Sequence, residues 1–277
     1  MKKYGKIAAT VVGVALIKTA LVAQTTYTWI GGTGNWNVGE NWTPAGPPPI
    51  NCGNIVIGGV NSVVTIPVGY TARVGLEPAQ NPPYNMIYGP EWGAQLHIYG
   101  TLIYDWHMAP VQWNPAARSF IGMYGNSYLS GEGICLGASW WWNDGPYVTM
   151  SMHDNALAEI NWMFWGGHLY LHDNAIMKIN YGLTVDTVGA VSDATRLIDI
   201  RSETAQLNLP GGFTPTVENW VSRGILKAFG GGGKIIVSEE LNPGRTTVMA
   251  LVPEPTTLAL IGSGCLTVRW MLRRRTK

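Results

Sequence analysis

Met152-His153-Asp154-Asn155-Ala156 recurs nineteen residues later as Leu171-His172-Asp173-Asn174-Ala175, and both copies continue to an Ile-Asn pair, at Ile160-Asn161 and Ile179-Asn180. The shared form is an apolar residue, a large polar residue and then a turn residue. Weaker copies lie at Ile98-Tyr99-Gly100-Thr101-Leu102, Met123-Tyr124-Gly125-Asn126-Ser127 and Ile200-Arg201-Ser202-Glu203-Thr204. The copies start 25, 29, 19 and 29 residues apart, and irregular repeats of this length are typical of solenoid proteins.

This repetition predicts an all-β chain that coils as an irregular, right-handed parallel β-solenoid, also called a β-helix. Each coil of such a fold lies about 4.8 Å above the previous one, so like residues form a ladder at each corner. Loops of variable length leave one corner, which accounts for the uneven spacing of the copies. A β-sandwich is the alternative because it also uses short strands with frequent turns, but it gives no reason for His-Asp-Asn to recur.

The expected strands are short runs rich in β-forming residues, separated by Gly, Pro and Asn. They are Asn54–Ile57, Ser62–Ile66, Thr71–Val74, Gln95–Ile98, Thr101–Tyr104, Lys234–Val237 and Thr246–Leu251. One segment differs, because Val217, Trp220 and Ile225 recur at helical spacing. We therefore expect one short helix within Val217–Phe229, with Thr216 as its cap.

A tryptophan- and glycine-rich segment precedes the repeats. Thr28–Trp42 reads TWIGGTGNWNVGENW and spaces Trp29, Trp36 and Trp42 among Gly and Asn. We expect these rings to cover the open end of the strand stack, which would otherwise expose an unpaired edge; a ligand site is the alternative. The pattern resembles the opening of secreted bacterial β-solenoid proteins, including autotransporter-like and planctomycete surface proteins.

Residues 1–23 have the three-part layout of a secretory signal peptide. A basic start with three lysines precedes an uncharged, mostly apolar run over Ile7–Ile17, and Leu21-Val22-Ala23 offers a cleavage site. We expect a signal helix that directs export and is then removed. An uncleaved N-terminal anchor is the alternative.

Residues 252–277 have the layout of a membrane anchor. Pro253-Glu254-Pro255 is followed by an uncharged stretch over Thr256–Val268, and Arg273, Arg274 and Arg275 lie close to the terminus. The stretch predicts a short hydrophobic transmembrane helix. The arginines would stop transfer and hold this end in the cytoplasm, with the body outside.

This tail resembles the PEP-CTERM sorting signal of Gram-negative and planctomycete-like bacteria. The resemblance implies that Pro253, Glu254 and Pro255 are recognised by exosortase, a membrane-embedded processing enzyme. It also implies export through the inner membrane, transient membrane anchoring by the C-terminal helix, and transfer to the cell surface or extracellular matrix. An ordinary single-pass anchor is the alternative.

The ends carry much of the positive charge. Nine of the 18 basic residues lie in residues 1–23 and 256–277, which hold no acid, so the remainder has nine basic and 17 acidic residues and a net charge of −8. An acidic body argues against binding of a nucleic-acid backbone. The expected organisation is therefore a signal peptide at 1–23, a cap and proline linker at 24–49, a solenoid body at 50–251 and a sorting signal at 252–277.

The repeated His-Asp pairs are the most suggestive candidates for a metal site. His153, Asp154, His172 and Asp173 would lie on adjacent coils, and imidazole nitrogen and carboxylate oxygen are suitable metal donors. However, Asp-Asn is also common turn chemistry, in which the side chains bond nearby backbone. We favour the structural interpretation and expect no metal and no other cofactor.

Aromatic residues are dense in the middle of the chain. Trp140-Trp141-Trp142, Trp162, Phe164 and Trp165 lie within 26 residues. In a strand, Trp140 and Trp142 would share one face. Exposed rings in a row would stack on the sugars of an exopolysaccharide, whereas buried rings would pack in the solenoid.

No constellation of residues indicates catalysis, so we expect no catalytic residues and no enzyme. Carboxylates are present, but no spacing singles out a pair for glycoside hydrolysis. They are Glu132, Asp144, Asp154, Glu159, Asp173, Asp186 and Asp199. Cys52 and Cys135 form an even pair in an oxidising compartment, and whether they bond depends on the register of the coils.

These observations predict an exported structural protein associated with the cell surface or extracellular matrix. A carbohydrate-binding module is the first alternative. An ice-binding protein and a polysaccharide-degrading enzyme are less favoured, because the sequence has neither a regular Thr-rich face nor a catalytic constellation.

Overall fold

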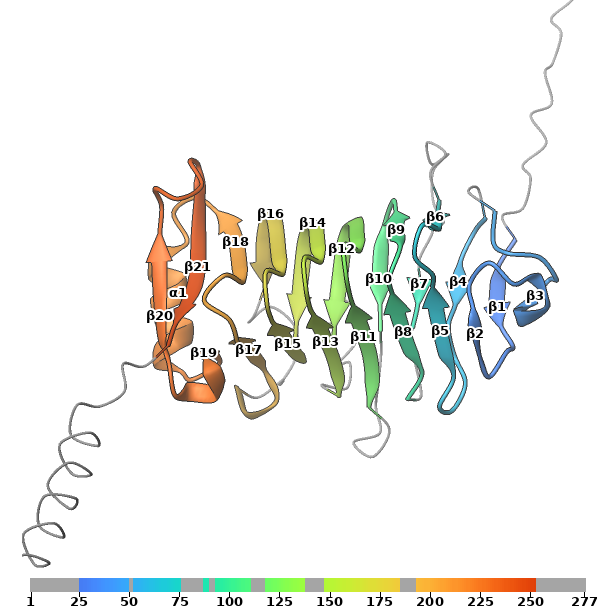
Figure 1. The fold of residues 1–277 in the computed structure, drawn as a ribbon, viewed down its shortest axis with the longest axis horizontal. Helices are drawn as coiled ribbons and strands as arrows, with labels where there is room; N and C mark the ends of the chain where they lie inside the picture. The colour runs from blue at the N-terminus through green and yellow to red at the C-terminus, as the bar shows by residue number, and fades with distance from the viewer. Residues whose placement is uncertain are drawn as a thin grey trace, which may run out of the picture.

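The body of the protein is a rod of stacked β-strands (Figure 1). The computed structural model describes residues 25–49, 52–75, 87–89, 93–110, 118–137, 147–184 and 193–252. The signal helix predicted at 1–23 and the hydrophobic helix predicted within 252–277 lie outside these residues. In the part of the chain that is described, no helix is long and apolar enough to cross a membrane.

One wall of the rod is an eight-stranded sheet in which every neighbouring pair is parallel. Its strands, in stacking order, are β2 (Thr33–Asn35), β5 (Val63–Ile66), β8 (Gln95–Ile98), β11 (Ser119–Met123), β13 (Val148–Met152), β15 (His168–Leu171), β17 (Leu197–Ile200) and β19 (Leu226–Ala228).

The second, thirteen-stranded sheet supplies the other two walls. Its parallel strands are β1 (Tyr27–Trp29), β4 (Ile55–Val56), β6 (Thr71–Val74), β7 (Ile87–Tyr88), β9 (Thr101–Tyr104), β10 (His107–Ala109), β12 (Tyr128–Leu136), β14 (Leu157–Trp165), β16 (Ile176–Thr184) and β18 (Gln206–Pro210). The first half of β12 pairs with β9 and its second half with β10. The long strands therefore bend around a corner and serve two walls each.

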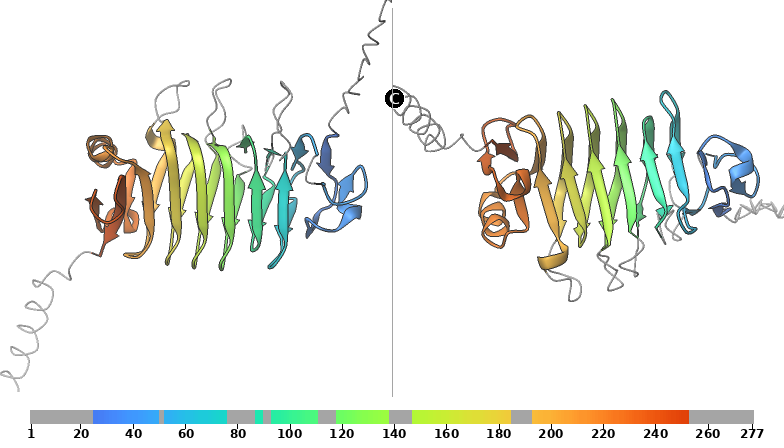
Figure 2. Two further views of the ribbon diagram at one scale, coloured as in Figure 1. Left: turned by 90° about the horizontal axis from the view of Figure 1, so that it is seen from above. Right: turned by 60° about the horizontal axis from the view of Figure 1, so that its bottom comes forward.

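These pairings confirm the β-solenoid and exclude the β-sandwich. Strands one coil apart lie side by side in parallel register in each view (Figure 2). Met152 pairs with Leu171, so the two His-Asp-Asn copies lie on adjacent coils as predicted. The right-handed sense of the coil stays a prediction.

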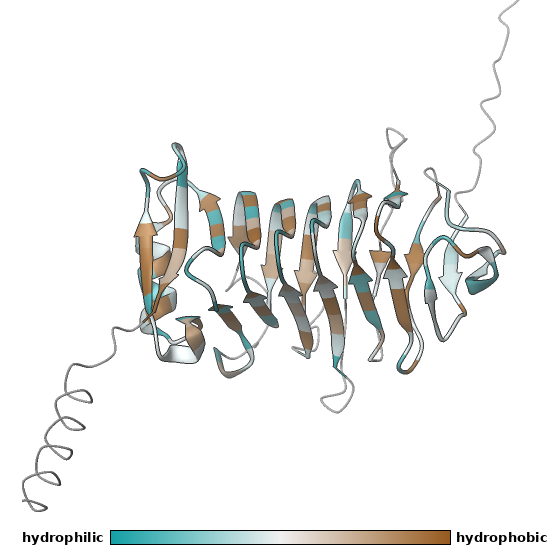
Figure 3. Ribbon diagram, in the orientation of Figure 1, coloured by the Kyte–Doolittle hydropathy of each residue, from teal (hydrophilic) through white to brown (hydrophobic). Residues whose placement is uncertain are grey.

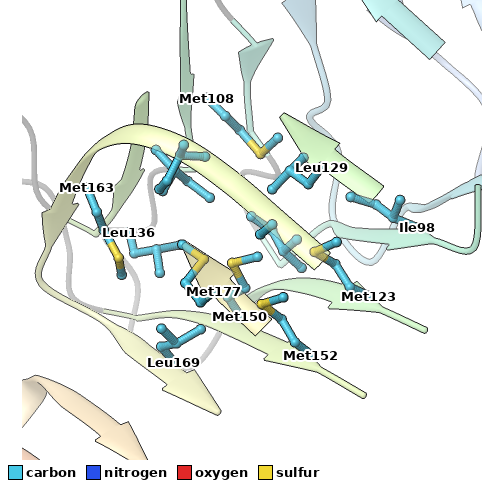
Figure 4. Close-up of a cluster of buried hydrophobic side chains, with 14 of the residues drawn as sticks. Ile98, Met108, Met123, Leu129, Leu136, Met150, Met152, Met163, Leu169 and Met177 are labelled. Atoms are coloured by element: carbon cyan, nitrogen blue, oxygen red, sulfur yellow. The ribbon is translucent and has the colours of Figure 1, made fainter. Parts of the chain in front are cut away.

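The interior is filled by side chains that alternate inward along the strands, which Figure 3 shows as brown bands on the ribbon. The centre of the rod is rich in methionine. Among the described residues, six methionines are fully buried, namely Met108, Met123, Met150, Met152, Met163 and Met177 (Figure 4). Methionine is unbranched and fills irregular gaps, which suits coils whose lengths differ.

Three tryptophans pack together at the N-terminal end of the stack. Trp29, Trp36 and Trp42 are buried, and their rings meet edge to face at centroid distances of 5.0 and 4.9 Å. The short strand β3 (Trp42–Thr43), which follows the 3-10 turn Gly39–Asn41, pairs antiparallel with β1. The rings are thus buried against one another at this end, and their role as a cap stays a prediction.

The C-terminal end is closed by antiparallel strands and a helix. β21 (Arg245–Leu251) pairs antiparallel with β18, and β20 (Lys234–Ser238) pairs antiparallel with β21. The helix α1 (Thr214–Ser222) packs beside β19 and β20 and buries Val217 and Trp220. Two further 3-10 turns, Asp193–Thr195 and Phe229–Gly231, lie near this end.

The predicted helix exists, but its boundaries were wrong. It begins at Thr214 instead of near Val217, because Pro215 occupies the first turn, where a missing N–H costs nothing. It ends at Ser222, because Gly224 adopts a positive φ of 71° that turns the chain toward β19. Ile225 is buried outside the helix.

The two body cysteines are not joined. Cys52 and Cys135 are both buried, and no disulfide links them. Burial raises the pKa of the Cys52 thiol to about 11, so this thiol is protonated and unreactive at neutral pH.

Substitution of glycines at the corner tests how closely the coils must approach one another. Gly100 allows close approach of the neighbouring coil, since a Cβ there would meet the backbone carbonyl oxygens of Pro67 and Tyr70. We expect Gly100→Ala to lower the free energy of unfolding by about 1–3 kcal/mol, measured by chemical denaturation. Gly125→Asn is the matched control, because Gly125 has open space and a φ of 65°, close to the φ of 57° of Asp154 one coil on. Equal losses in the two variants would contradict this account.

Candidate functional site

The corner between the eight-stranded wall and its neighbour carries a column of stacked rings. Tyr99, Tyr124, His153 and His172 occupy the second position of successive repeats, and we call them the ring ladder. Their centroids are 4.9, 5.3 and 4.3 Å apart from one coil to the next, with interplanar angles of 20°, 9° and 12°. Because the backbone repeat fixes the spacing, each ring packs face to face on the next.

This stacking determines which part of each ring meets solvent. The faces of the inner rings are covered by their neighbours, so the ladder presents ring edges outward. A sugar ring packs on an aromatic face, which makes the interior of the ring ladder unsuited to sugar stacking. In the fifth repeat Arg201 takes the ring position, and its guanidinium lies 4.2 Å from the ring centroid of Tyr170.

Next to the rings, the aspartates of the repeat bond to backbone. Asp154 accepts a hydrogen bond from the N–H of Gly125 at 2.8 Å, and Asp173 accepts one from the N–H of Asp154 at 3.0 Å. Both aspartates adopt positive φ angles, 57° and 51°, which Asp tolerates better than most residues. The carboxylates therefore link each turn to the preceding coil.

The asparagines of the repeat form a parallel amide ladder. The side-chain N–H of Asn155 donates to Asn126, and that of Asn174 donates to Asn155, each at 3.0 Å. In such a ladder each amide satisfies the next, which stabilises the register of the coils.

The metal candidates are brought together, but not as a ligand set. His153 and His172 stack in parallel instead of converging, and Asp154 and Asp173 are committed to backbone N–H groups. In the described segments no group of three or more His, Cys, Asp or Glu side chains could hold a metal ion. The geometry favours the turn-chemistry interpretation.

The electrostatics of the corner disfavour a charged imidazole. Burial lowers the pKa of His172, and the neighbouring His153 and Arg201 lower it further, while Asp173 and Asp199 oppose the shift. Burial also lowers the pKa values of His97 and His168 on the same wall. These shifts favour the neutral form of the three imidazoles over the charged form.

The aromatic cluster of the sequence divides into buried and exposed rings. Trp165 is fully buried, and Phe164 packs with Ala109 and Cys135 in a small second cluster. Trp162 is 38% exposed. The predicted sugar-stacking pair, Trp140 and Trp142, lies outside the described residues.

Trp162 has an aromatic neighbour that the sequence interpretation missed. Tyr181 is 61% exposed, and its ring centroid lies 5.7 Å from that of Trp162, with the planes inclined at 48°. Tyr99 and Tyr124 were also missed as site residues. The signal for them was present, because the repeats place Tyr, Tyr, His and His at the same position.

The candidate carboxylates are bonded within the solenoid. Glu159 accepts hydrogen bonds from Lys178 at 2.7 Å and Tyr128 at 2.9 Å, and the Lys178 bond is the main cause that lowers the pKa of Glu159. Asp199 bonds to Arg201 and to the N–H of Gly230. Asp144 and Asp186 lie outside the described residues.

An open cavity of about 430 Å³ lies near the C-terminal end and is lined by His168, Arg196, Arg223, Lys227 and Asp193, among others. Arg223 pairs with Asp193 at 2.6 Å, and Arg196 lies 3.7 Å from the same carboxylate. The cavity thus contains an internal ion-pair cluster.

Comparison with known proteins identifies the tail. Residues 251–275 match the model of the PEP-CTERM protein-sorting motif. This range contains Pro253-Glu254-Pro255 and the arginines Arg273, Arg274 and Arg275, and it begins at the last residue of β21. No curated protein and no solved structure matches the chain.

The ring ladder makes stability depend on pH. The pKa of His172 is lower in the folded state than its usual value of 6.5. The contribution of the neutral His172 ring to the free energy of unfolding is therefore complete above pH 6.5. It is lost as the pH falls through the lowered pKa of the folded state. We expect His172→Tyr, which keeps a stacked ring, to reduce the drop in melting temperature between about pH 7.5 and about pH 5. Tyr124→Phe removes no titrating group in this range and should leave the drop unchanged; an equal effect of both variants would contradict the prediction.

Proposed function

We propose that this chain is an exported structural protein of the cell surface or extracellular matrix. The observation that carries the proposal is the PEP-CTERM motif at 251–275, which begins where the last strand of the solenoid ends. The motif supports export and exosortase-dependent sorting to the cell surface. The body would thus be delivered as a folded rod attached directly to its sorting signal.

The proposed route begins with the signal peptide at 1–23 and passes through the inner membrane. The hydrophobic stretch within 252–277 would hold the protein there for a time, with Arg273, Arg274 and Arg275 on the cytoplasmic side. An exosortase-like enzyme would then act at Pro253-Glu254-Pro255. The body would remain at the cell surface or enter the extracellular polymer.

The structural role is supported by how the polar groups of the body are used. The Asp154–Asp173, Asn155–Asn174 and Glu159–Lys178 contacts each join neighbouring coils. Groups that would serve binding or catalysis in an enzyme are thus engaged in holding the stack together. We therefore propose a non-enzymatic role, and the polysaccharide-degrading alternative has no described carboxylate pair in its favour.

A carbohydrate-binding role is the second candidate. The exposure of Trp162 and Tyr181 favours it, because two adjacent exposed rings on an acidic body form an amphipathic surface. The ice-binding alternative requires a regular Thr-rich face, and the ring ladder and amide ladder occupy the corner where repeats are most regular.

Intact-mass analysis of the protein recovered from native cells tests the sorting route. We expect the surface-bound protein to lack residues 1–23 and the hydrophobic tail. Replacement of Pro253, Glu254 and Pro255 by Ala should leave the tail in place and the protein in the inner-membrane fraction, because the processing enzyme loses its recognition sequence. Gly125→Asn is a matched body variant that should be sorted normally. Recovery of surface protein that retains residues 256–277 would show a plain membrane anchor instead.

A further inference from the structure

We propose that Trp162 and Tyr181 form a sugar-stacking platform that binds a neutral polysaccharide on the outer wall formed by β14 and β16. The platform is independent of the sorting signal and lies away from the ring ladder. Its parts are the two exposed rings, a glycine under one of them and a row of half-buried polar side chains beside them.

A β-bulge places Tyr181 next to Trp162. Ile160 pairs with Ile179, but Trp162 pairs with Gly182, so β16 carries one extra residue at this point. Such a bulge re-aims side chains. Ile160 and Met163 are both fully buried, so the two residues between them, Asn161 and Trp162, share the outer side of the bend.

Gly182 lets the indole lie against the strand. A Cβ at Gly182 would stand 2.9 Å from Cζ3 and 3.2 Å from Cε3 of Trp162, so the six-membered ring covers this glycine. One coil earlier the ring of His107 occupies the space above its paired glycine, Gly133, in the same way. The indole therefore lies against the backbone at Gly182 while 38% of the Trp162 side chain stays exposed. Exposed aromatic surface is what the C–H groups of a pyranose ring pack on, since the aromatic face is electron-rich.

Polar side chains flank the platform in a fixed row. Asn161 donates to Glu132 at 2.6 Å, Asn180 donates to Asn161 at 3.0 Å, and Arg245 donates to Asn180 at 2.5 Å. Each asparagine uses one N–H and one carbonyl lone pair in these bonds and keeps one of each for sugar hydroxyls. Because the row is already ordered, binding a sugar costs little side-chain entropy.

The charge of the body selects the class of polysaccharide. The chain without its two ends has a net charge of −8, which repels polyanions at low salt. The arginine of the row is bonded to Asn180 and to the carbonyl oxygen of Ile179. A neutral hexose polymer with flat, apolar ring faces fits the platform, and an acidic polymer does not.

Affinity electrophoresis of the full chain in gels containing β-1,4-glucan, β-1,3-glucan or α-1,6-glucan tests the proposal. We expect retardation by at least one neutral glucan, and about a tenfold or greater loss of affinity in Trp162→Ala and in Tyr181→Ala. Trp162→Phe should recover part of the affinity, because it restores a flat ring over Gly182. Tyr99→Ala is the matched control, since it removes an exposed ring from the ring ladder and should bind as the wild type does.

Unchanged affinity in a folded Trp162→Ala variant would overturn the proposal, as would retention by polygalacturonate alone or by none of the polymers. Thermal melts establish that each variant is folded. Failure of sorting is a separate outcome, because the electrophoresis does not depend on where the protein is located. A variant with Ala at Pro253, Glu254 and Pro255 should therefore keep its glucan affinity.

Discussion

The structure depends on one constraint, the parallel register that places each coil about 4.8 Å above the previous one. At that distance like side chains must interact with their own kind. Rings stack from Tyr99 to His172, amides bond from Asn126 to Asn174, and carboxylates accept hydrogen bonds from backbone N–H groups of the preceding coil. Burial at this packed corner, together with the neighbouring His153 and Arg201, lowers the pKa of His172. The regular stacking of the coils and the hydrogen bonding of their polar side chains thus have the same cause.

The constraint also explains what could be predicted from sequence. The repeated His-Asp-Asn motif was sufficient to predict the solenoid, because like residues that stack in a ladder recur along the sequence. The ring ladder left the same trace, but Tyr99 and Tyr124 were seen only as large polar residues of weaker repeats. The helix was placed too late, because apolar spacing marks the buried face and does not mark the turn that Pro215 begins. Tyr181 could not be predicted, because its position depends on a bulge in the pairing of β16 with β14.

The ring-ladder corner and the wall of β14 and β16 differ in how their aromatic rings are covered. At the corner, four successive coils supply a ring, so the inner rings of Tyr124 and His153 have neighbours on both faces. On the wall of β14 and β16, Trp162 lies against Gly182, which has no side chain, and 38% of the tryptophan side chain stays exposed. The proposed glucan binding would use the wall of β14 and β16, whereas the rings at the corner serve the stacking of the coils.

Both ends of the stack are closed, by Trp29, Trp36 and Trp42 at the start and by α1 with antiparallel β20 and β21 at the finish. End elements of this kind hinder the pairing of further molecules with the strands of the stack. The number of coils then sets the length of a single molecule. The length of the rod is therefore proportional to the number of its coils. Duplication or loss of one complete coil would change its length by a single strand spacing and leave the terminal caps intact.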